Sequence, residues 1–420
     1  MNVRPEMRLA VPAAAGSPGP ADGARARSAN PYVTLGIAMI AAMFDGYDGQ
    51  VIGFLAPAIG KDWSLPRSEF GVIFSVGLVG LILGAMLVAP LADRLGRRAI
   101  AIAGATVAAA FTLLSVFAAN PTQLALLRLM TGIGLGTLMP ILVTIVHEAA
   151  PPRRSGIFVT FLVTAFPFGS ALGGFLVAWG LQHGGWRDIF LASGLAASFY
   201  PILFYAFLWP APLPPRAADA PARKMTVTGL FRGTWWRPTI LLWILFFTSL
   251  LNIYTLAAWM PLLLERGGLG TVEAVRYASI LGVGGTIGGI LLGVAAERLG
   301  GMVLAIAYVV AAAALIGIGL TGGFGMILTA LIATVGVAIV GGHVGNSVLA
   351  ARIYPASMNA TGVGWAQGLG RVGCVVGPMA VGAAVAANAT NTSIFLASAT
   401  VAVAAALAAF GLAVQARGNT

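Results

Sequence analysis

Long apolar segments separated by short polar ones dominate the chain. A segment of about 20 apolar residues is long enough to cross a bilayer as a helix. Twelve such segments can be counted, at 32–59, 70–92, 99–118, 121–147, 155–181, 187–209, 238–263, 274–296, 302–321, 324–348, 359–386 and 391–414. The pattern therefore predicts an all-α membrane protein with twelve transmembrane helices. Because twelve is even, both chain termini are expected on one side of the membrane.

Composition supports a membrane protein and argues against nucleic-acid binding. The 420 residues are 59% hydrophobic and only 9% charged, with a mean hydropathy of +0.92. Soluble domains contain about 25% charged residues, so a soluble fold of this composition would expose too much apolar surface. The net charge of +11 lies mainly in the tails and in short loops. It does not form the concentrated patch that a nucleic acid requires.

The distribution of basic residues predicts the orientation. Seventeen of the 24 Lys and Arg residues fall on the side of the N-terminus, and five fall on the opposite side. Cytoplasmic loops carry an excess of Lys and Arg, so both termini are expected in the cytosol.

Two polar stretches divide the chain. The first 30 residues are rich in Ala, Pro, Gly and Arg and lack the apolar run of a signal peptide. The stretch from Pro210 to Pro238 is the longest polar interruption and separates six segments from six. We predict a disordered cytosolic tail at 1–30, an N-terminal six-helix half at 31–209, a cytosolic linker at 210–237, a C-terminal six-helix half at 238–414 and a cytosolic tail at 415–420.

The two halves carry related loops. The loop after the second segment reads Asp93-Arg94-Leu95-Gly96-Arg97-Arg98, and the loop after the eighth reads Glu297-Arg298-Leu299-Gly300. Asp93 and Glu297 are 204 residues apart. Internal duplication of a six-helix unit is typical of transporters whose binding site lies between the halves.

Two acids lie in the middle of the first segment. Asp45 and Asp48 are three residues apart, which places them on one face of a helix. A charge at this depth costs about 2.5–3.5 kcal/mol on insertion scales and marks a functional candidate. The competing interpretation is a structural pair bonded to neighbouring helices. With Arg128 and Arg371, which also lie within apolar segments, the formal charges sum to zero.

These charged residues suggest separate roles. The planar guanidinium of Arg371 suits a carboxylate substrate, although a permanent salt bridge to Asp45 or Asp48 would also explain it. Burial and mutual repulsion both disfavour two ionised carboxylates, so either acid is a candidate proton carrier. Arg128 is a candidate for proton coupling or for structure. His343 can titrate in the working range, although a lone histidine is more often a satisfied core residue.

Six further residues are candidates for substrate contact. Aromatic rings can stack on an aromatic ligand, and amide side chains can bond its ring substituents, although for any single residue ordinary helix packing is the better explanation. The candidates are Tyr47, Tyr254, Trp259, Asn346, Trp365 and Gln367.

The loop motif and the intramembrane charges resemble a known family. Six plus six helices with the Asp93 loop are similar to the major facilitator superfamily, although Ala89 replaces the glycine that usually opens the motif. Arg128 resembles the arginine of that superfamily's fourth helix, which is linked there to proton coupling. Asp45-Gly46-Tyr47-Asp48 resembles the signature of the aromatic acid:proton symporter family, as does the stretch from Arg352 to Gly373.

The resemblance implies a transporter rather than an enzyme. It implies a monomeric, multi-pass protein of the bacterial cytoplasmic (inner) membrane that imports a small aromatic carboxylate, of benzoate or hydroxybenzoate type, together with protons by alternating access. No cofactor is expected, and protons serve as the coupling ion. Transport of another organic anion, export of a drug or metabolite, and sensing without transport are the alternatives. The acid, the proton stoichiometry and the choice between Asp45 and Asp48 remain open at this stage.

Overall fold

The computed structural model describes residues 30–151, 154–207, 227–231, 233–321 and 325–418. The predicted N-terminal tail before Asn30 and most of the predicted linker lie outside these ranges. In chain order, the helical elements are α1 (Pro31–Asp62), η1 (Arg67–Glu69), α2 (Phe70–Leu83), η2 (Gly84–Val88), η3 (Ala89–Leu91), α3 (Ala92–Leu95), α4 (Arg97–Leu114), η4 (Ser115–Phe117), α5 (Pro121–Ala149), α6 (Ser155–Gly180), α7 (Trp186–Ala197), α8 (Phe199–Phe207), η5 (Val227–Phe231), α9 (Trp236–Arg266), α10 (Thr271–Leu299), α11 (Gly301–Leu320), α12 (Met326–Val335), η6 (Gly336–Val340), α13 (Gly341–Ile353), α14 (Ala356–Ala386) and α15 (Asn391–Gly418).

The helices confirm the predicted fold class, with ends within a few residues of the expected positions. Eleven helical segments of the described chain are long and apolar enough to span a membrane. The remaining long helix is α1, which has 32 residues and is made less apolar by Asp45, Asp48 and Gln50. Several predicted spans consist of more than one element. Pro90, for example, lies where the second span changes from η2 to η3, because proline cannot donate the backbone hydrogen bond of a regular helix.

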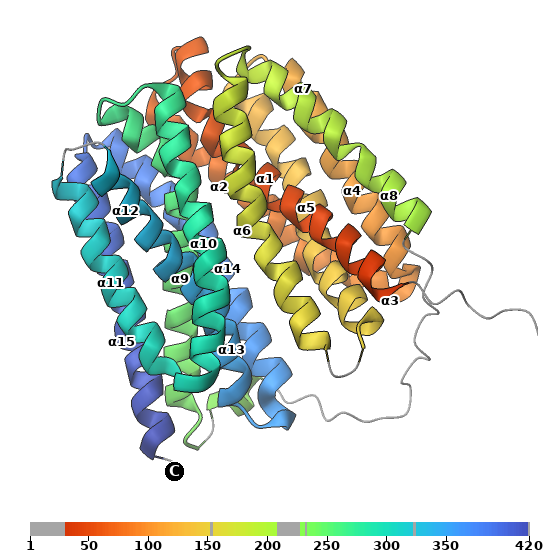
Figure 1. Ribbon diagram of the computed structural model, residues 1–420, viewed down its shortest axis with the longest axis vertical. Helices are drawn as coiled ribbons and strands as arrows, with labels where there is room; N and C mark the ends of the chain where they lie inside the picture. Colours follow the sequence, from red (N-terminus) through yellow and green to blue (C-terminus); the bar gives the residue numbers. More distant parts are fainter. Residues whose placement is uncertain (1–29, 152–153, 208–226, 232, 322–324, 419–420) are drawn as a thin grey trace, which may run out of the picture.

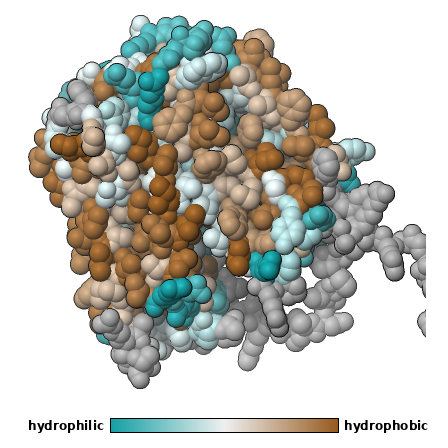
Figure 2. All heavy atoms as spheres, viewed as in Figure 1, coloured by the Kyte–Doolittle hydropathy of each residue, from teal (hydrophilic) through white to brown (hydrophobic). Residues whose placement is uncertain are grey.

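The helices form two bundles that lie side by side. In Figure 1 the N-terminal half, from α1 to α8, lies to the right of the C-terminal half, from α9 to α15. Helices α1, α2 and α6 of the first half pack against α9, α14 and α10 of the second half, respectively. Figure 2 shows apolar side chains over the middle of this face, between hydrophilic ends. Such a belt matches the hydrocarbon region of a bilayer.

The apolar cores show how the halves meet. We call the end of the molecule where α1 begins and α15 ends the terminal end, and the opposite end the distal end. At the distal end one continuous core contains residues of both halves, such as Phe74 on α2 and Trp259 on α9. At the terminal end each half has its own core, one built around Leu142 and Phe204 and the other around Phe246. The halves are therefore packed together distally and separate towards the terminal end.

Polar contacts between the halves follow the same division. The Glu265 carboxylate at the end of α9 lies 2.8 Å from the Lys61 ammonium and 3.5 Å from the Arg67 guanidinium, both from the other half. The Ser75 hydroxyl on α2 donates to the carbonyl oxygen of Val375 on α14 at 3.0 Å. Within the described ranges, no hydrogen bond or ion pair joins the halves near the terminal end. The distal end is thus the closed side of the molecule.

Replacing Glu265 by Gln is expected to weaken distal closure by about 0.5–1 kcal/mol, a two- to five-fold shift in population. The effect is modest because Lys61 and Arg67 are 64% and 47% exposed. The alkylation rate of a Ser75→Cys probe in a Cys374→Ser background measures the shift, since distal opening exposes this site. Glu273→Gln, at an exposed acid on the neighbouring helix α10, is the matched control. An equal rate in both variants would contradict a closing role for Glu265.

At the distal end of the N-terminal half, Asp62 connects α1 to α7. Its carboxylate accepts hydrogen bonds from the Trp186 indole nitrogen at 3.0 Å and from the Arg187 guanidinium at 2.9 Å. These two contacts hold the pKa of Asp62 below its usual value of 3.8. A lowered folded-state pKa gives stability that is present above the usual value and is lost as pH falls through the folded-state value. The link between α1 and α7 is therefore intact at neutral pH.

Candidate functional site

Close packing of α1 against α6 places the two acids of α1 inside the protein. A Cβ atom added at Gly46 would lie 1.9 Å from the carbonyl oxygen of Phe166, and one added at Gly169 would lie 1.8 Å from that of Met43. Only glycine allows the two backbones to approach this closely. Asp45 and Asp48 are consequently buried, at 3% and 6% exposure.

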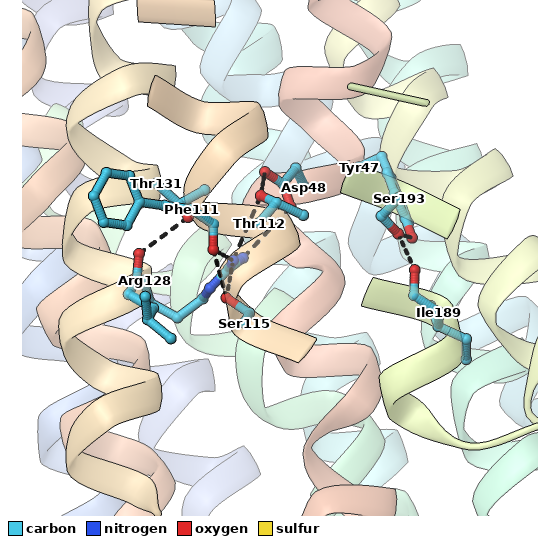
Figure 3. A network of polar contacts seen from close by, with 10 residues as sticks. Tyr47, Asp48, Phe111, Thr112, Ser115, Arg128, Thr131, Ile189 and Ser193 are labelled. Carbon is cyan, nitrogen blue, oxygen red and sulfur yellow. Dashed lines mark hydrogen bonds and ion pairs between the residues drawn. The ribbon is translucent and has the colours of Figure 1, made fainter. Parts of the chain in front are cut away.

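Asp48 belongs to a network inside the N-terminal half (Figure 3). Its carboxylate accepts a hydrogen bond from the Thr112 hydroxyl at 2.8 Å and forms an ion pair with the Arg128 guanidinium at 3.4 Å. Arg128 also donates to the Ser115 hydroxyl at 2.7 Å, and its guanidinium lies 4.9 Å from the centre of the Phe190 ring. The structure thus pairs Asp48 with Arg128 rather than with Arg371.

Asp45 and Arg371 remain without such partners. The Oδ1 atom of Asp45 and the Nη1 atom of Arg371 are buried and accept or donate no hydrogen bond within the described chain. No described acid lies within 4.0 Å of the Arg371 guanidinium, which belongs to α14 of the C-terminal half. Two opposite charges therefore lie on opposite halves without a direct ion pair between them.

A second polar network lies in the C-terminal half. The Asn346 amide donates to the Tyr308 hydroxyl at 2.7 Å, Tyr308 donates to the Ser249 hydroxyl at 3.1 Å, and Ser249 lies 3.3 Å from His343 Nδ1. Ser249 stands 204 residues after Asp45, the offset that relates Asp93 to Glu297. The position that holds the acid Asp45 in the first half therefore holds the uncharged Ser249 in the second.

The aromatic candidates do not share one place. Tyr254 packs with Leu78 and Cys374 where α9, α2 and α14 meet, within range of the charges of Arg371 and Asp45. Tyr47 instead forms a hydrogen bond with Ser193 of α7, on the far side of α1. The structure brings Tyr254, but not Tyr47, towards Arg371.

The other three candidates lie elsewhere. Trp259 is fully buried in the distal core and donates to the carbonyl oxygen of Pro378 at 3.1 Å. Trp365 is exposed towards the terminal end and stacks on Trp243 with 6.3 Å between ring centres. Gln367 is exposed two residues further along α14. In this conformation Trp259 acts as a packing residue, whereas Trp365 and Gln367 are accessible.

The repeated loops share an unusual backbone. Gly96 and Gly300 occupy equivalent positions between two helices, with φ of 95° and 69°. This left-handed region favours glycine. Around the first loop, Arg97 pairs with Glu148, and Arg98 donates to the carbonyl oxygen of Tyr205. Around the second loop, Arg352 donates to the carbonyl oxygen of Glu297, while Arg298 is exposed. Both loops thus hold neighbouring helices together at the terminal end.

Asp93→Ala is expected to slow conformational cycling several-fold without changing which ligands bind. The reason is its place: Asp93 is exposed in the first turn of α3, in the loop at the terminal end and away from Asp45 and Arg371. The transport rate measures conformational cycling, and the binding affinities for several aromatic acids measure ligand preference. Arg94→Ala serves as a second variant in the same loop. A changed order of ligand preference would contradict this role.

The sequence reasoning missed several residues of these networks. Thr112, Ser115, Ser193, Tyr200 and Tyr308 are hydroxyl residues of apolar helices that are buried or partly buried. Their sequence signal is weak, because a hydroxyl can also bond its own helix backbone one turn earlier. Ser115, for example, donates to the carbonyl oxygen of Phe111 at 2.8 Å. Only the packing of helices shows which hydroxyls meet a charge.

The charged and polar residues of the described site do not form a metal-binding cluster. Within the described ranges, no three His, Cys, Asp or Glu side chains lie close enough to hold a metal ion. The polar groups of the site are instead two acids, two arginines, a histidine and several hydroxyls. Together with two repeated helical bundles, they define a membrane transporter with a charged centre.

Comparison with known proteins gives the family. The family model described as Major Facilitator Superfamily matches residues 38–378, and the chain belongs to this superfamily. Two solved structures share the fold: a bacterial homolog of the human lysosomal transporter Spinster, with a TM-score of 0.72 at 18% identity over 92% of this chain and 97% of that one, and the xylose transporter XylE of Escherichia coli, with a TM-score of 0.68 at 16% identity over 90% and 96%.

Relatives of greater sequence similarity confirm the narrower resemblance to the aromatic acid:proton symporter family. The gallate transporter of Pseudomonas putida is 34% identical, over 84% of this chain and 85% of the relative. The 3-(3-hydroxy-phenyl)propionate transporter of Escherichia coli K12 is 32% identical, over 90% and 93%. The 4-hydroxybenzoate transporter PcaK of Acinetobacter baylyi is 30% identical, over 81% and 82%.

Proposed function

We propose that the protein is a proton-coupled symporter that imports a small aromatic carboxylate by alternating access. It would lie in the bacterial cytoplasmic (inner) membrane as a monomer, with both termini in the cytosol. The relatives named above for gallate, 4-hydroxybenzoate and hydroxyphenylpropionate support the substrate class. With cytosolic termini, distal closure corresponds to an inward-facing conformation.

The observation that carries the proposal is the uncompensated pair of Asp45 and Arg371. Arg371 offers a buried guanidinium atom without a partner, and a planar guanidinium can bond both oxygens of a carboxylate. Asp45 is a buried acid on the opposite half, whereas Arg371 as a whole is half-buried. Tyr254 lies within range of both charges and can supply an aromatic contact.

Arg371 couples the two ligands because it can compensate only one anion. When the substrate carboxylate binds Arg371, it neutralises the positive charge that would otherwise favour an ionised Asp45 from the opposite half. A buried carboxylate without a partner is costly, so substrate binding favours protonation of Asp45. By linkage, protonation of Asp45 favours substrate binding to the same extent. Asp48 is compensated by Arg128, so we assign the coupling proton to Asp45.

Charge also constrains the stoichiometry. Moving one elementary charge across 100 mV involves about 2.3 kcal/mol. A carboxylate entering alone would be opposed by an inside-negative potential. One proton for each anion makes the step electroneutral and leaves the central charges summing to zero, and a second proton would make the potential a driving force.

Uptake into proteoliposomes tests this function directly. Radiolabelled gallate and 4-hydroxybenzoate should accumulate against their gradients when the outside is made acidic, and a protonophore should abolish accumulation. A thermal-shift screen with aromatic acids selects the substrate beforehand. Binding without translocation would identify a sensor. Accumulation of the acid inside the vesicles while protons move outward would identify a proton antiporter, and hence an exporter. Either result would overturn the proposal.

A further inference from the structure

A small cavity lies inside the N-terminal half, next to both acids of α1. Its volume is about 10 Å³. Roughly 10–15 Å³ of such space holds one water molecule. The lining comes from α1, α4, α5, α7 and α8, and it includes Asp45, Asp48, Tyr47, Ser193 and Tyr200. The described C-terminal half contributes nothing to the lining, so this cavity is separate from the junction that Arg371 faces.

Two of the lining groups are buried without a hydrogen-bond partner. They are the Oδ1 atom of Asp45 and the hydroxyl of Tyr200, whose residues are 3% and 5% exposed. Leaving such a group unsatisfied costs about 1–3 kcal/mol, and buried polar groups are nearly always paired with protein or with ordered water. Within the described chain the cavity is where a shared partner of these two groups can sit.

We propose that this cavity binds one water molecule, which joins Asp45, Asp48 and Tyr200 into a single proton-sharing unit. Water offers two donors and two acceptor positions. It would donate one hydrogen to the Asp45 carboxylate and one to the Asp48 carboxylate, and it would accept the hydrogen of the Tyr200 hydroxyl. A buried water typically makes about three hydrogen bonds, so these three contacts satisfy the water and both unpartnered groups.

The bridge gives the proton a path between the acids. A proton on Asp48 passes to the water oxygen while the water gives one of its own protons to Asp45. The water is unchanged, Asp48 becomes a carboxylate and Asp45 becomes a carboxylic acid. The Arg128 guanidinium, 3.4 Å from Asp48, stabilises the charge left behind. Tyr200 is a positioning residue in this scheme, because it orients the water and keeps its own proton.

Other ionisable groups surround the pair and set its pH response. They are Tyr47 on α1 itself, Arg128 on α5, Tyr200 on α8, Tyr254 on α9 and Arg371 on α14. The relay step rests on the proposed proton coupling, whereas the water site itself does not.

Tyr200→Phe is the first test. The change removes the hydroxyl and keeps the ring, which contacts Phe44 edge-on at 4.6 Å between centres. We expect proton-driven uptake to fall at least about tenfold, because the water that transfers the proton is no longer oriented and positioned proton transfer contributes ~10²–10⁴-fold. Substrate counterflow should stay within about two-fold of wild type, because exchange needs no net proton transfer. The pH profile and the solvent isotope effect of uptake should change as well.

Filling the cavity is the second test. Ala108→Val places methyl groups in the lining, and Ala105→Val, one turn away on the same helix and outside the lining, is the matched control. Tyr205→Phe removes an exposed hydroxyl on α8 and controls for Tyr200→Phe. Thermal unfolding of each variant shows that the protein is folded. Wild-type uptake with an unchanged isotope effect in folded Tyr200→Phe and Ala108→Val would overturn the relay.

A crystal structure at a resolution that shows ordered waters separates the two proposals. A density peak within hydrogen-bond distance of Asp45 and Tyr200, lost in Tyr200→Phe or Ala108→Val, supports the water site. An empty cavity in such a structure of the wild type overturns the site. A wild type without proton-driven uptake instead refutes the proposed function, and the density then decides the water site independently.

Discussion

Arg371→Ala is expected to weaken binding of an aromatic carboxylate at least about 100-fold. The guanidinium has a buried nitrogen without a hydrogen-bond partner in the described chain, on α14 of the half opposite to Asp45. Losing one partner of a desolvated charge pair costs about 2–5 kcal/mol, and each 1.4 kcal/mol is tenfold in affinity. Calorimetric titration of the purified protein with its acid measures the loss.

Two variants control for the Arg371 prediction. Arg371→Lys keeps the charge but not the planar fork, so its affinity should be intermediate. Arg276→Ala removes an exposed cation at the start of α10 and should leave affinity unchanged. If Arg371→Ala binds the acid as tightly as wild type does, the carboxylate is held elsewhere.

Asp45→Asn is expected to abolish accumulation driven by a proton gradient while counterflow persists. Asparagine is similar in shape and cannot carry the coupling proton. Substrate should therefore only equilibrate across the membrane, which is a loss of more than about tenfold when the imposed gradient exceeds one pH unit. Labelled uptake and counterflow in the same proteoliposomes measure the two activities. Uphill accumulation by this variant would remove Asp45 as the carrier.

Asp48→Asn provides a contrast with Asp45→Asn. Asp48 forms the ion pair with Arg128 and accepts from Thr112, so its neutralisation leaves a buried guanidinium uncompensated. Removing one partner of a buried pair costs about 3–5 kcal/mol. We expect Asp48→Asn to lower thermal stability strongly, whereas Asp45→Asn should not, because Asp45 has no ion pair to lose.

The sequence predicted the helices well because their signal is local. Spans such as 121–147 and 391–414 end within a few residues of α5 and α15, since apolar length is a property of the segment itself. The Gly96 and Gly300 loops were also predictable, because the two loops have similar sequences and a positive φ favours glycine. The four intramembrane charges were found for the same reason: they interrupt apolar runs.

Pairing within the site was not predictable in the same way. A salt bridge from Arg371 to an acid of α1 was as consistent with the sequence as the observed Asp48–Arg128 pair. Tyr47 and Trp259 were placed among the substrate contacts, yet Tyr47 bonds Ser193 and Trp259 bonds the carbonyl oxygen of Pro378. Which helices adjoin, and at what rotation, depends on contacts between residues far apart in the chain.

By itself the sequence determined that this is a twelve-helix membrane protein of two related halves with charged residues at its centre. Hydrophobicity, charge and repetition are carried by single positions, so no partner is needed to recognise them. The tertiary structure alone decided that Asp48 is compensated within one half, that Asp45 and Arg371 form no ion pair, and that the halves are closed at the distal end. These properties depend on distances between helices, and only packing sets those distances.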